Sequence, residues 1–268
     1  MDRELLLLVV ALAASGPWLL WTGRRGTDDT AVPSARDLER RRWRALWRPF
    51  VPLAFVAALL AGWALQEPAA AEQPSRWLAV LAVPGAALAF RAAIRAVRSL
   101  SLPPAEHATG TVGVLRPAVR IAPALQARLD GPALAAVNAH EAAHVRHRDP
   151  LRIWLARLAT DLQAGTAAKS RLSAWLTALE LARDEEARDH GASGIALGEA
   201  ILAAARLPRV GAAVAGPDAD LSERIERLLQ PVPAQAADHA KAWWVALLPL
   251  AALGGVAYGE PLLRWMLW

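Results

Sequence analysis

The sequence predicts a mainly α-helical protein that crosses a membrane four times and carries one folded domain between the third and fourth spans. Three observations favour this fold class. Fifty-five per cent of the 268 residues are apolar, the mean hydropathy is +0.23, and four apolar runs are each about long enough to cross a bilayer. Soluble domains usually contain fewer apolar residues, so the composition alone favours membrane segments.

We assign the four spans to residues 1–21, 49–66, 77–97 and 242–260. The first contains an uncharged run, Leu5–Trp21, for which the alternative is a signal peptide cleaved near ALAA at residues 11–14. The preceding MDRE lacks the net positive charge of a signal peptide, so we favour an anchor. The third contains Pro84 and reaches full length only if its arginines extend toward lipid headgroups. The fourth has tryptophans near both ends, which is typical of a membrane interface.

Arginines set the predicted orientation. The segment 22–48 contains eight arginines, whereas the loop 67–76 has one arginine and two glutamates. Because positively charged loops stay in the cytoplasm, we place 22–48 and the domain 98–241 inside the cell. The loop 67–76 and both termini, with the tail 261–268, lie outside, and the predicted location is the inner membrane. This placement explains the net charge of +5 without a nucleic-acid partner.

The domain 98–241 is expected to combine a short β segment with several helices. Gly110–Pro123 alternates in part and carries β-branched residues, which predicts one or two short strands. Asp130 suits the N-cap of the following helix, and Pro132 suits its first turn. Further helices are expected at residues 150–162, 170–190, 193–207 and 218–229, the second of them closed by Gly191.

The main candidate site lies in NAHEAAH, residues 138–144. Residues four apart share a face of a helix, so His140 and His144 can bind one metal ion, and Glu141 lies beside them. This is the HExxH arrangement, in which zinc binds two histidines and the glutamate activates a zinc-bound water. The alternative interpretation is a solvent-exposed polar face of an alanine-rich helix.

A catalytic zinc needs a third protein ligand. The chain has no cysteine, which leaves histidine and carboxylate ligands. Glu180, in LELARDEEARD, is the best candidate, and Asp184 lies one turn later on the same helical face. A carboxylate there can accept the outer N–H of a ligand histidine. We interpret the neighbouring charged residues as a solvated face: Arg183, Glu185, Glu186 and Arg188.

HEAAHVRHRDPLRIW followed by ELARDEEA resembles the BlaR/MecR-type membrane zinc metallopeptidases. The resemblance covers residues 110–232 and includes the order of three spans, domain and one span. It implies a gluzincin-like α+β metallopeptidase domain that binds Zn²⁺ through His140, His144 and Glu180. Glu141 would be the general base and Asp184 would orient a ligand histidine. An extended peptide would pair with the predicted edge strand, and the expected substrate is a cytoplasmic or membrane-proximal protein such as a transcriptional repressor.

Three departures from that family limit what the resemblance implies. Arg183 stands where the family usually has a cysteine, which a position without metal contact tolerates. AGTAAKSRLSAW, residues 164–175, replaces the usual segment between the two motifs, which leaves the pocket wall open. The chain ends after the fourth predicted span, so we expect no penicillin-binding sensor domain and no direct β-lactam sensing. A separate sensor is the expected partner, besides the lipid bilayer and the substrate.

Two other functions compete with this one. An HtpX-like or CAAX-processing membrane protease shares HExxH and ExxxD, and a non-catalytic signalling scaffold could retain the fold. The intact Glu141 argues against the scaffold, because a protein without chemistry does not need that base. His190 and Arg148 are candidates to stabilise an oxyanion. His147 is expected to face solvent, and we place His107 and His239 in loops.

Overall fold

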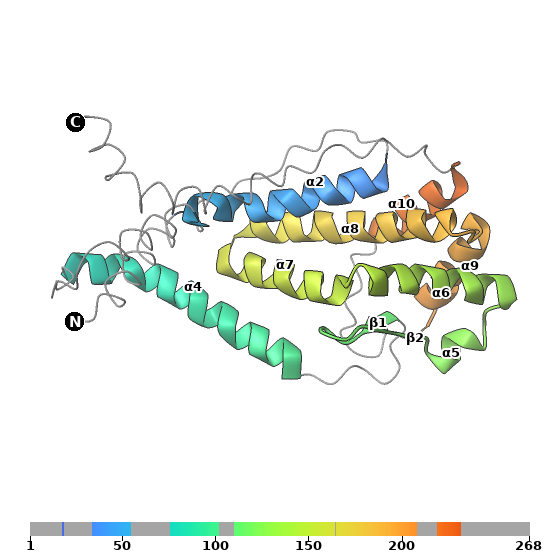
Figure 1. The fold of residues 1–268 in the computed structure, drawn as a ribbon, viewed down its shortest axis with the longest axis horizontal. Helices are drawn as coiled ribbons and strands as arrows, with labels where there is room; N and C mark the ends of the chain where they lie inside the picture. Colours follow the sequence, from blue (N-terminus) through green and yellow to red (C-terminus); the bar gives the residue numbers. More distant parts are fainter. Residues whose placement is uncertain are drawn as a thin grey trace, which may run out of the picture.

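The computed structural model describes residues 18, 34–54, 76–101, 110–163, 165–207 and 219–231. Four helices form its central body: α2 (Ala35–Trp47), α6 (Gly131–Arg146), α7 (Asp149–Gln163) and α8 (Thr166–Asp189). Helix α2 lies along α8, and α6 and α7 follow one another along the opposite side of α8 (Figure 1). The remaining elements surround this body: η1 (Arg48–Phe50), α4 (Arg76–Ser101), α5 (Pro123–Gln126), α9 (Gly194–Ala205) and α10 (Ala219–Leu229).

The predicted β segment forms a two-stranded antiparallel sheet. Strand β1 (Gly110–Val112) pairs with β2 (Ala118–Arg120), with Thr111 opposite Val119. Both strands contact α6. The sheet therefore lies against the helix that carries the HExxH motif.

Local sequence signals fix the helix that carries the motif and the end of α8. The side chain of Asp130 accepts a hydrogen bond of 2.8 Å from the backbone N–H of Ala133, which caps α6 as predicted. Arg148 has a φ of +52° in the turn between α6 and α7, a conformation that few residues other than glycine adopt. Gly191, with a φ of +92°, follows the end of α8 as expected.

Alanine fills much of the core. One cluster packs α6, α8, α9 and α10 together through small residues, among them Ala136, Ala187 and Ala196. Another joins α2 to α7 and α8 around the fully buried Trp175, whose ring centroid lies 4.9 Å from that of Trp43 on α2. The small side chains let helices approach closely, which is how an alanine-rich chain reaches the packing density of a protein interior.

The predicted four-span membrane fold is wrong. Within the described residues, no helix combines the length and the apolar character that a bilayer crossing requires. Helix α4 covers the proposed third span, 77–97, but Arg91 and Arg95 point to protein partners. Arg91 donates to the backbone carbonyl of Asp161 on α7, and the Arg95 guanidinium lies 2.7 Å from the Asp161 carboxylate. These arginines therefore bind a neighbouring helix, where the sequence interpretation had assigned them to lipid headgroups.

The rest of the predicted membrane topology falls largely beyond the described residues. This applies to the fourth span, to residues 55–66 of the second span, to the loop 67–76 except Arg76, to the tail 261–268 and to all of the first span except Trp18, as well as to His107 and His239. The second half of the predicted loop 22–48 forms α2, which packs on α8 with the buried side chain of Leu46. The folded body thus begins well before residue 98.

Candidate metal centre

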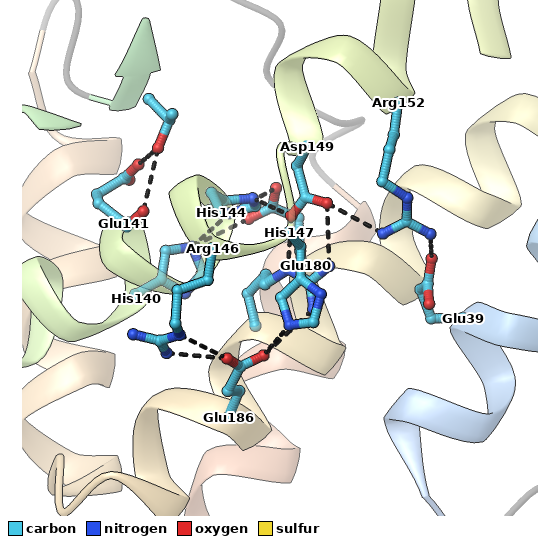
Figure 2. Close-up of polar contacts among 12 residues, drawn as sticks. Glu39, His140, Glu141, His144, Arg146, His147, Asp149, Arg152, Glu180 and Glu186 are labelled. Carbon is cyan, nitrogen blue, oxygen red and sulfur yellow. Dashed lines mark hydrogen bonds and ion pairs between the residues drawn. The ribbon is translucent and has the colours of Figure 1, made fainter. Parts of the chain in front are cut away.

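Two histidines on α6 and a glutamate on α8 converge on one point between these helices. The Nε2 atoms of His140 and His144 lie 3.0 Å apart. The carboxylate of Glu180 approaches both, at 3.5 Å from His140 Nε2 and 3.7 Å from His144 Nε2. Within the described part of the chain, these three residues form a group whose ligand atoms could hold a metal ion (Figure 2).

The spacing of these atoms is near that of a zinc site. Tetrahedral zinc with bonds of about 2.0–2.1 Å to nitrogen and oxygen places its ligand atoms roughly 3.3 Å apart. The two Nε2 atoms are 3.0 Å apart, Glu180 approaches His140 through Oε2 and His144 through Oε1, and one ligand atom from each residue lies within 4.8 Å of the others. Two imidazoles and one carboxylate are also the donor set of many catalytic zinc sites, and they leave the fourth position for water.

Each ligand histidine has a carboxylate on its other ring nitrogen. His140 Nδ1 lies 2.9 Å from Asp184 Oδ1, the neighbour predicted from helical spacing. His144 Nδ1 lies 2.9 Å from Asp149 Oδ2, which the sequence interpretation had not assigned. A carboxylate in this position fixes the tautomer and the ring orientation so that Nε2 faces the metal. A hydrogen bond therefore holds His144, whereas His140 Nδ1 is in ion-pair contact with Asp184 and has no hydrogen bond of good geometry.

Asp149 reaches His144 because of the turn between their helices. Arg148, in the left-handed conformation, links α6 to α7, and Asp149, the first residue of α7, lies within hydrogen-bond distance of His144 near the end of α6. The side chain of Asp149 is fully buried. The signal for this role was the aspartate five residues after His144 in HVRHRD, whose contact depends on a backbone conformation that spacing alone does not specify.

The electrostatics of the cluster favour positive charge at the imidazole of His140. Burial alone would lower the pKa of His140, but contacts with Asp184 and Glu180 outweigh it and raise the pKa to about 10. Burial alone would raise the pKa of Glu180, but the charge of Arg224 and the contact with His140 hold it well below its usual range. The acidic groups are therefore ionised at neutral pH, as metal ligands and their partners must be.

Arg224 on α10 is a further residue of the centre that the sequence interpretation missed. Its guanidinium donates two hydrogen bonds of 2.8 Å to Asp184 and lies 3.1 Å from Glu180 Oε2. Burial alone would lower the pKa of Arg224, but the charges of Asp184 and Glu180 outweigh it and raise the pKa. The charge of Glu141 adds to this increase. Arg224 thus holds two carboxylates of the site in place and lies near the third.

Glu141, the predicted general base, is held by the β segment. The hydroxyl of Thr111 on β1 donates to Glu141 Oε2 at 2.9 Å and lies 3.2 Å from the backbone carbonyl of Glu141 (Figure 2). Burial leaves 9% of Glu141 exposed. Strand β1 therefore positions the carboxylate of Glu141, and it also has the backbone edge on which an extended peptide was predicted to pair.

The interpretation of 183–188 as a solvated charged face is wrong for its first three charges. Arg183, Glu185 and Glu186 are buried, and Arg183 donates to Asp149 through Nε at 2.5 Å and Nη2 at 3.0 Å. Arg188 is partly buried and donates to the backbone carbonyls of Arg227, in α10, and Gln230, just after it. Burying charged groups is tolerated because every one of them meets an opposite charge or a carbonyl.

The other candidate residues have structural partners. His147 is half exposed, and its Nε2 lies 2.8 Å from Glu186 Oε2. His190 is the C-cap of α8, with Nδ1 2.8 Å from the backbone carbonyl of Glu186. Arg148 forms the turn described above. The oxyanion role considered for His190 and Arg148 stays a prediction.

Glu186 is expected to make the free energy of unfolding depend on pH in the acid range. Burial alone would raise its pKa, but contacts with His147 and Arg146 lower it from an ordinary 4.5 to about 2. The ionised form therefore stabilises the fold above about pH 4.5, and this contribution is lost as the pH falls toward 2. Because its partners are partly exposed, we expect Glu186→Gln to cost about 1–2 kcal/mol at pH 7.

Urea unfolding between pH 2 and pH 7 tests this expectation. Glu186→Gln should reduce the stability at pH 7 and flatten the acid limb of the profile. Glu223→Gln is the matched control, because Glu223 forms an exposed ion pair with Arg227. An acid limb as steep as in the wild type would contradict the role of Glu186.

Comparisons of the chain with protein-family models, with curated proteins and with solved structures found no match. The resemblance to the BlaR/MecR-type peptidases therefore remains a prediction. The geometry of His140, Glu141, His144, Glu180 and their partners is what indicates a function for this chain.

Proposed function

We propose that this protein is a zinc-dependent endopeptidase. One observation carries the proposal: two imidazoles and a carboxylate converge with one ligand atom each within 4.8 Å of the others, and a separate carboxylate lies 2.9 Å from the other ring nitrogen of each imidazole. In this proposal His140, His144 and Glu180 bind the metal, and Asp184 and Asp149 orient the histidines. A plain polar helix face has no need for this matched pair of outer carboxylates.

The chain supplies a base next to the ligands. Zinc, when bound, acts as a Lewis acid that acidifies water and polarises a carbonyl. Glu141 accepts the proton of the attacking water and delivers it to the leaving amine. The hydroxyl of Thr111 directs one oxygen of this carboxylate and leaves the other available. Arg224 supplies positive charge next to Glu180 while the reaction develops negative charge.

The substrate class follows from the β segment and from the resemblance. β1 lies against the motif helix, and a polypeptide in extended form can add to a strand edge by backbone hydrogen bonds. The BlaR/MecR-type resemblance adds a transcriptional repressor as the candidate substrate and a separate sensor as a partner. An HtpX-like protease would share the same centre, and cleavage of many unfolded proteins would distinguish it.

A metal-free structural role is the second candidate. The raised pKa of His140 and the ion pairs of Arg224 favour it, because a protonated imidazole and an arginine can neutralise Glu180 and Asp184 without a metal. In that case the protein would be a scaffold. The two candidates differ in whether the cluster takes up zinc.

Zinc content tests the proposal. We expect about one zinc per chain in the purified wild type and a loss of that zinc in His144→Ala and in Glu180→Ala, because two ligands do not retain a catalytic zinc. His147→Ala is the matched control: it removes a histidine one turn away that pairs with Glu186. Its zinc content should equal that of the wild type. A wild type that takes up no zinc after reconstitution would leave the scaffold.

A further inference from the structure

Three charged side chains, Glu39, Arg152 and Asp149, form a charge series that connects α2 to the proposed metal ligand His144. Asp149, which lies 2.9 Å from His144 Nδ1, accepts a hydrogen bond of 3.0 Å from Arg152 Nη1. The other terminal nitrogen of Arg152 donates to Glu39 on α2. Figure 2 shows this series from the imidazole to the helix α2. Its ends are more than a hundred residues apart in the sequence.

Arg152 is fixed between its two carboxylates. Its guanidinium lies over the ring of Trp43 at 4.7 Å and near the ring of Trp175 at 5.6 Å. Stacking on these rings restricts its plane, so each terminal nitrogen faces one acid. A change at Glu39 is therefore transmitted to Asp149 by the same rigid group.

Packing does not explain Glu39. Glu39 is 6% exposed and lies on the face of α2 that meets α8. An apolar residue would pack there without the cost of removing a charge from water. Glu39 accepts hydrogen bonds from Trp175 Nε1 at 3.0 Å and from Arg152. Its negative charge also acts on Arg183, the second arginine that binds Asp149. Both arginines that hold Asp149 are thus balanced by Glu39.

We infer that Glu39 is a positioning residue of the metal centre, acting through Arg152 and Asp149 on the orientation of His144. Without its charge, Arg152 has only Asp149 as a charged partner and shifts toward it. The hydrogen bond that Asp149 accepts from His144 Nδ1 weakens, and the imidazole loses its fixed direction. Helix α2 is therefore part of the metal centre in the folded protein. This inference rests on the proposed zinc binding.

Zinc affinity of the full chain, measured by competition with a chelator, tests the inference. Removing a carboxylate that contacts a ligand histidine costs about 10–100-fold in affinity, and Glu39 is two contacts further out. We therefore expect Glu39→Gln, which keeps an acceptor for Trp175, to weaken zinc binding by about 3–10-fold. The visible spectrum of bound Co²⁺ should also shift, because it reports ligand geometry.

Arg42→Ala is the matched control. Arg42 also joins α2 to α8, by donating to the backbone carbonyl of Ala174, and the contacts of the charge series described above are made by other residues. It should leave the zinc affinity within about twofold and the Co²⁺ spectrum unchanged, because the ligands and their partners stay in place. Arg152→Lys is a second variant, since lysine cannot bridge both carboxylates, and it should weaken zinc binding in the same way.

The outcomes separate this inference from the proposed function. A wild type that binds no zinc overturns both. A wild type that binds zinc, with unchanged affinity and Co²⁺ spectrum in Glu39→Gln and Arg152→Lys, overturns the positioning role alone. Equal weakening by Arg42→Ala and Glu39→Gln also overturns it, because general loosening of α2 would then explain the loss.

Discussion

Glu141→Gln is expected to lower peptidase activity by about 10²–10⁴-fold, the usual contribution of a general base. Glutamine has nearly the same shape but cannot take a proton from water at neutral pH. The side chain keeps an acceptor for the hydroxyl of Thr111. Zinc content should equal that of the wild type, because His140, His144 and Glu180 are intact.

Peptide-bond hydrolysis and zinc content, measured on the same preparation, check this expectation. Thr111→Val is a graded control, because it keeps the base and removes only the hydrogen bond that directs it. Its activity should lie between those of the wild type and Glu141→Gln. Activity of Glu141→Gln close to that of the wild type would exclude Glu141 as the base and direct attention to another acceptor at the centre.

Helical periodicity accounts for the part of the site that the sequence could predict. His140 and His144 are four residues apart on α6, and Glu180 and Asp184 are four apart on α8. Each pair shares a face, and the structure turns these two faces toward each other. Asp130 predicted the start of α6 and Gly191 the end of α8 for the same reason, because each residue acts on the helix turn next to it.

The residues of the site that the sequence did not predict reach it through tertiary contacts. Arg224 comes from α10, and Glu39 comes from α2. Arg183 was interpreted as solvent-exposed because charged runs usually are, yet it turns inward to Asp149. Nothing in the local spacing distinguishes an arginine that meets solvent from one that meets a buried carboxylate. Only the packing of α2, α7 and α8 decides it.

The four-span prediction was wrong because it took a high apolar fraction, much of it alanine, to favour bilayer segments. Alanine raises the apolar fraction, but in this fold it fills helix contacts, as at Ala136 and Ala187. In α4, the arginines taken as headgroup contacts bind Asp161 instead. Hydropathy averages cannot separate a span from a helix that packs on protein through its charged side chains.

Asp149→Ala is expected to destabilise the fold by about 3–5 kcal/mol, the usual effect of removing one partner of a buried ion pair. Asp149 is fully buried, and Arg183 is 3% exposed. The variant leaves Arg183 without its bidentate partner and removes one of the two charged partners of Arg152. Folded proteins are stable by only about 5–15 kcal/mol, so much of the total is at risk.

Urea unfolding at pH 7 measures the loss, and two variants calibrate it. Asp37→Ala removes an exposed ion pair with Arg40 on α2 and should cost less than about 1 kcal/mol. Combining Asp149→Leu with Arg183→Met removes both charges and should recover part of the loss, since apolar pairs replace buried ion pairs at little cost. If Asp149→Ala were no worse than Asp37→Ala, Asp149 would not be the buried centre of the charge network. The stability of the fold and the orientation of His144 depend on the same carboxylate, so this variant should also lose zinc while Asp37→Ala retains it.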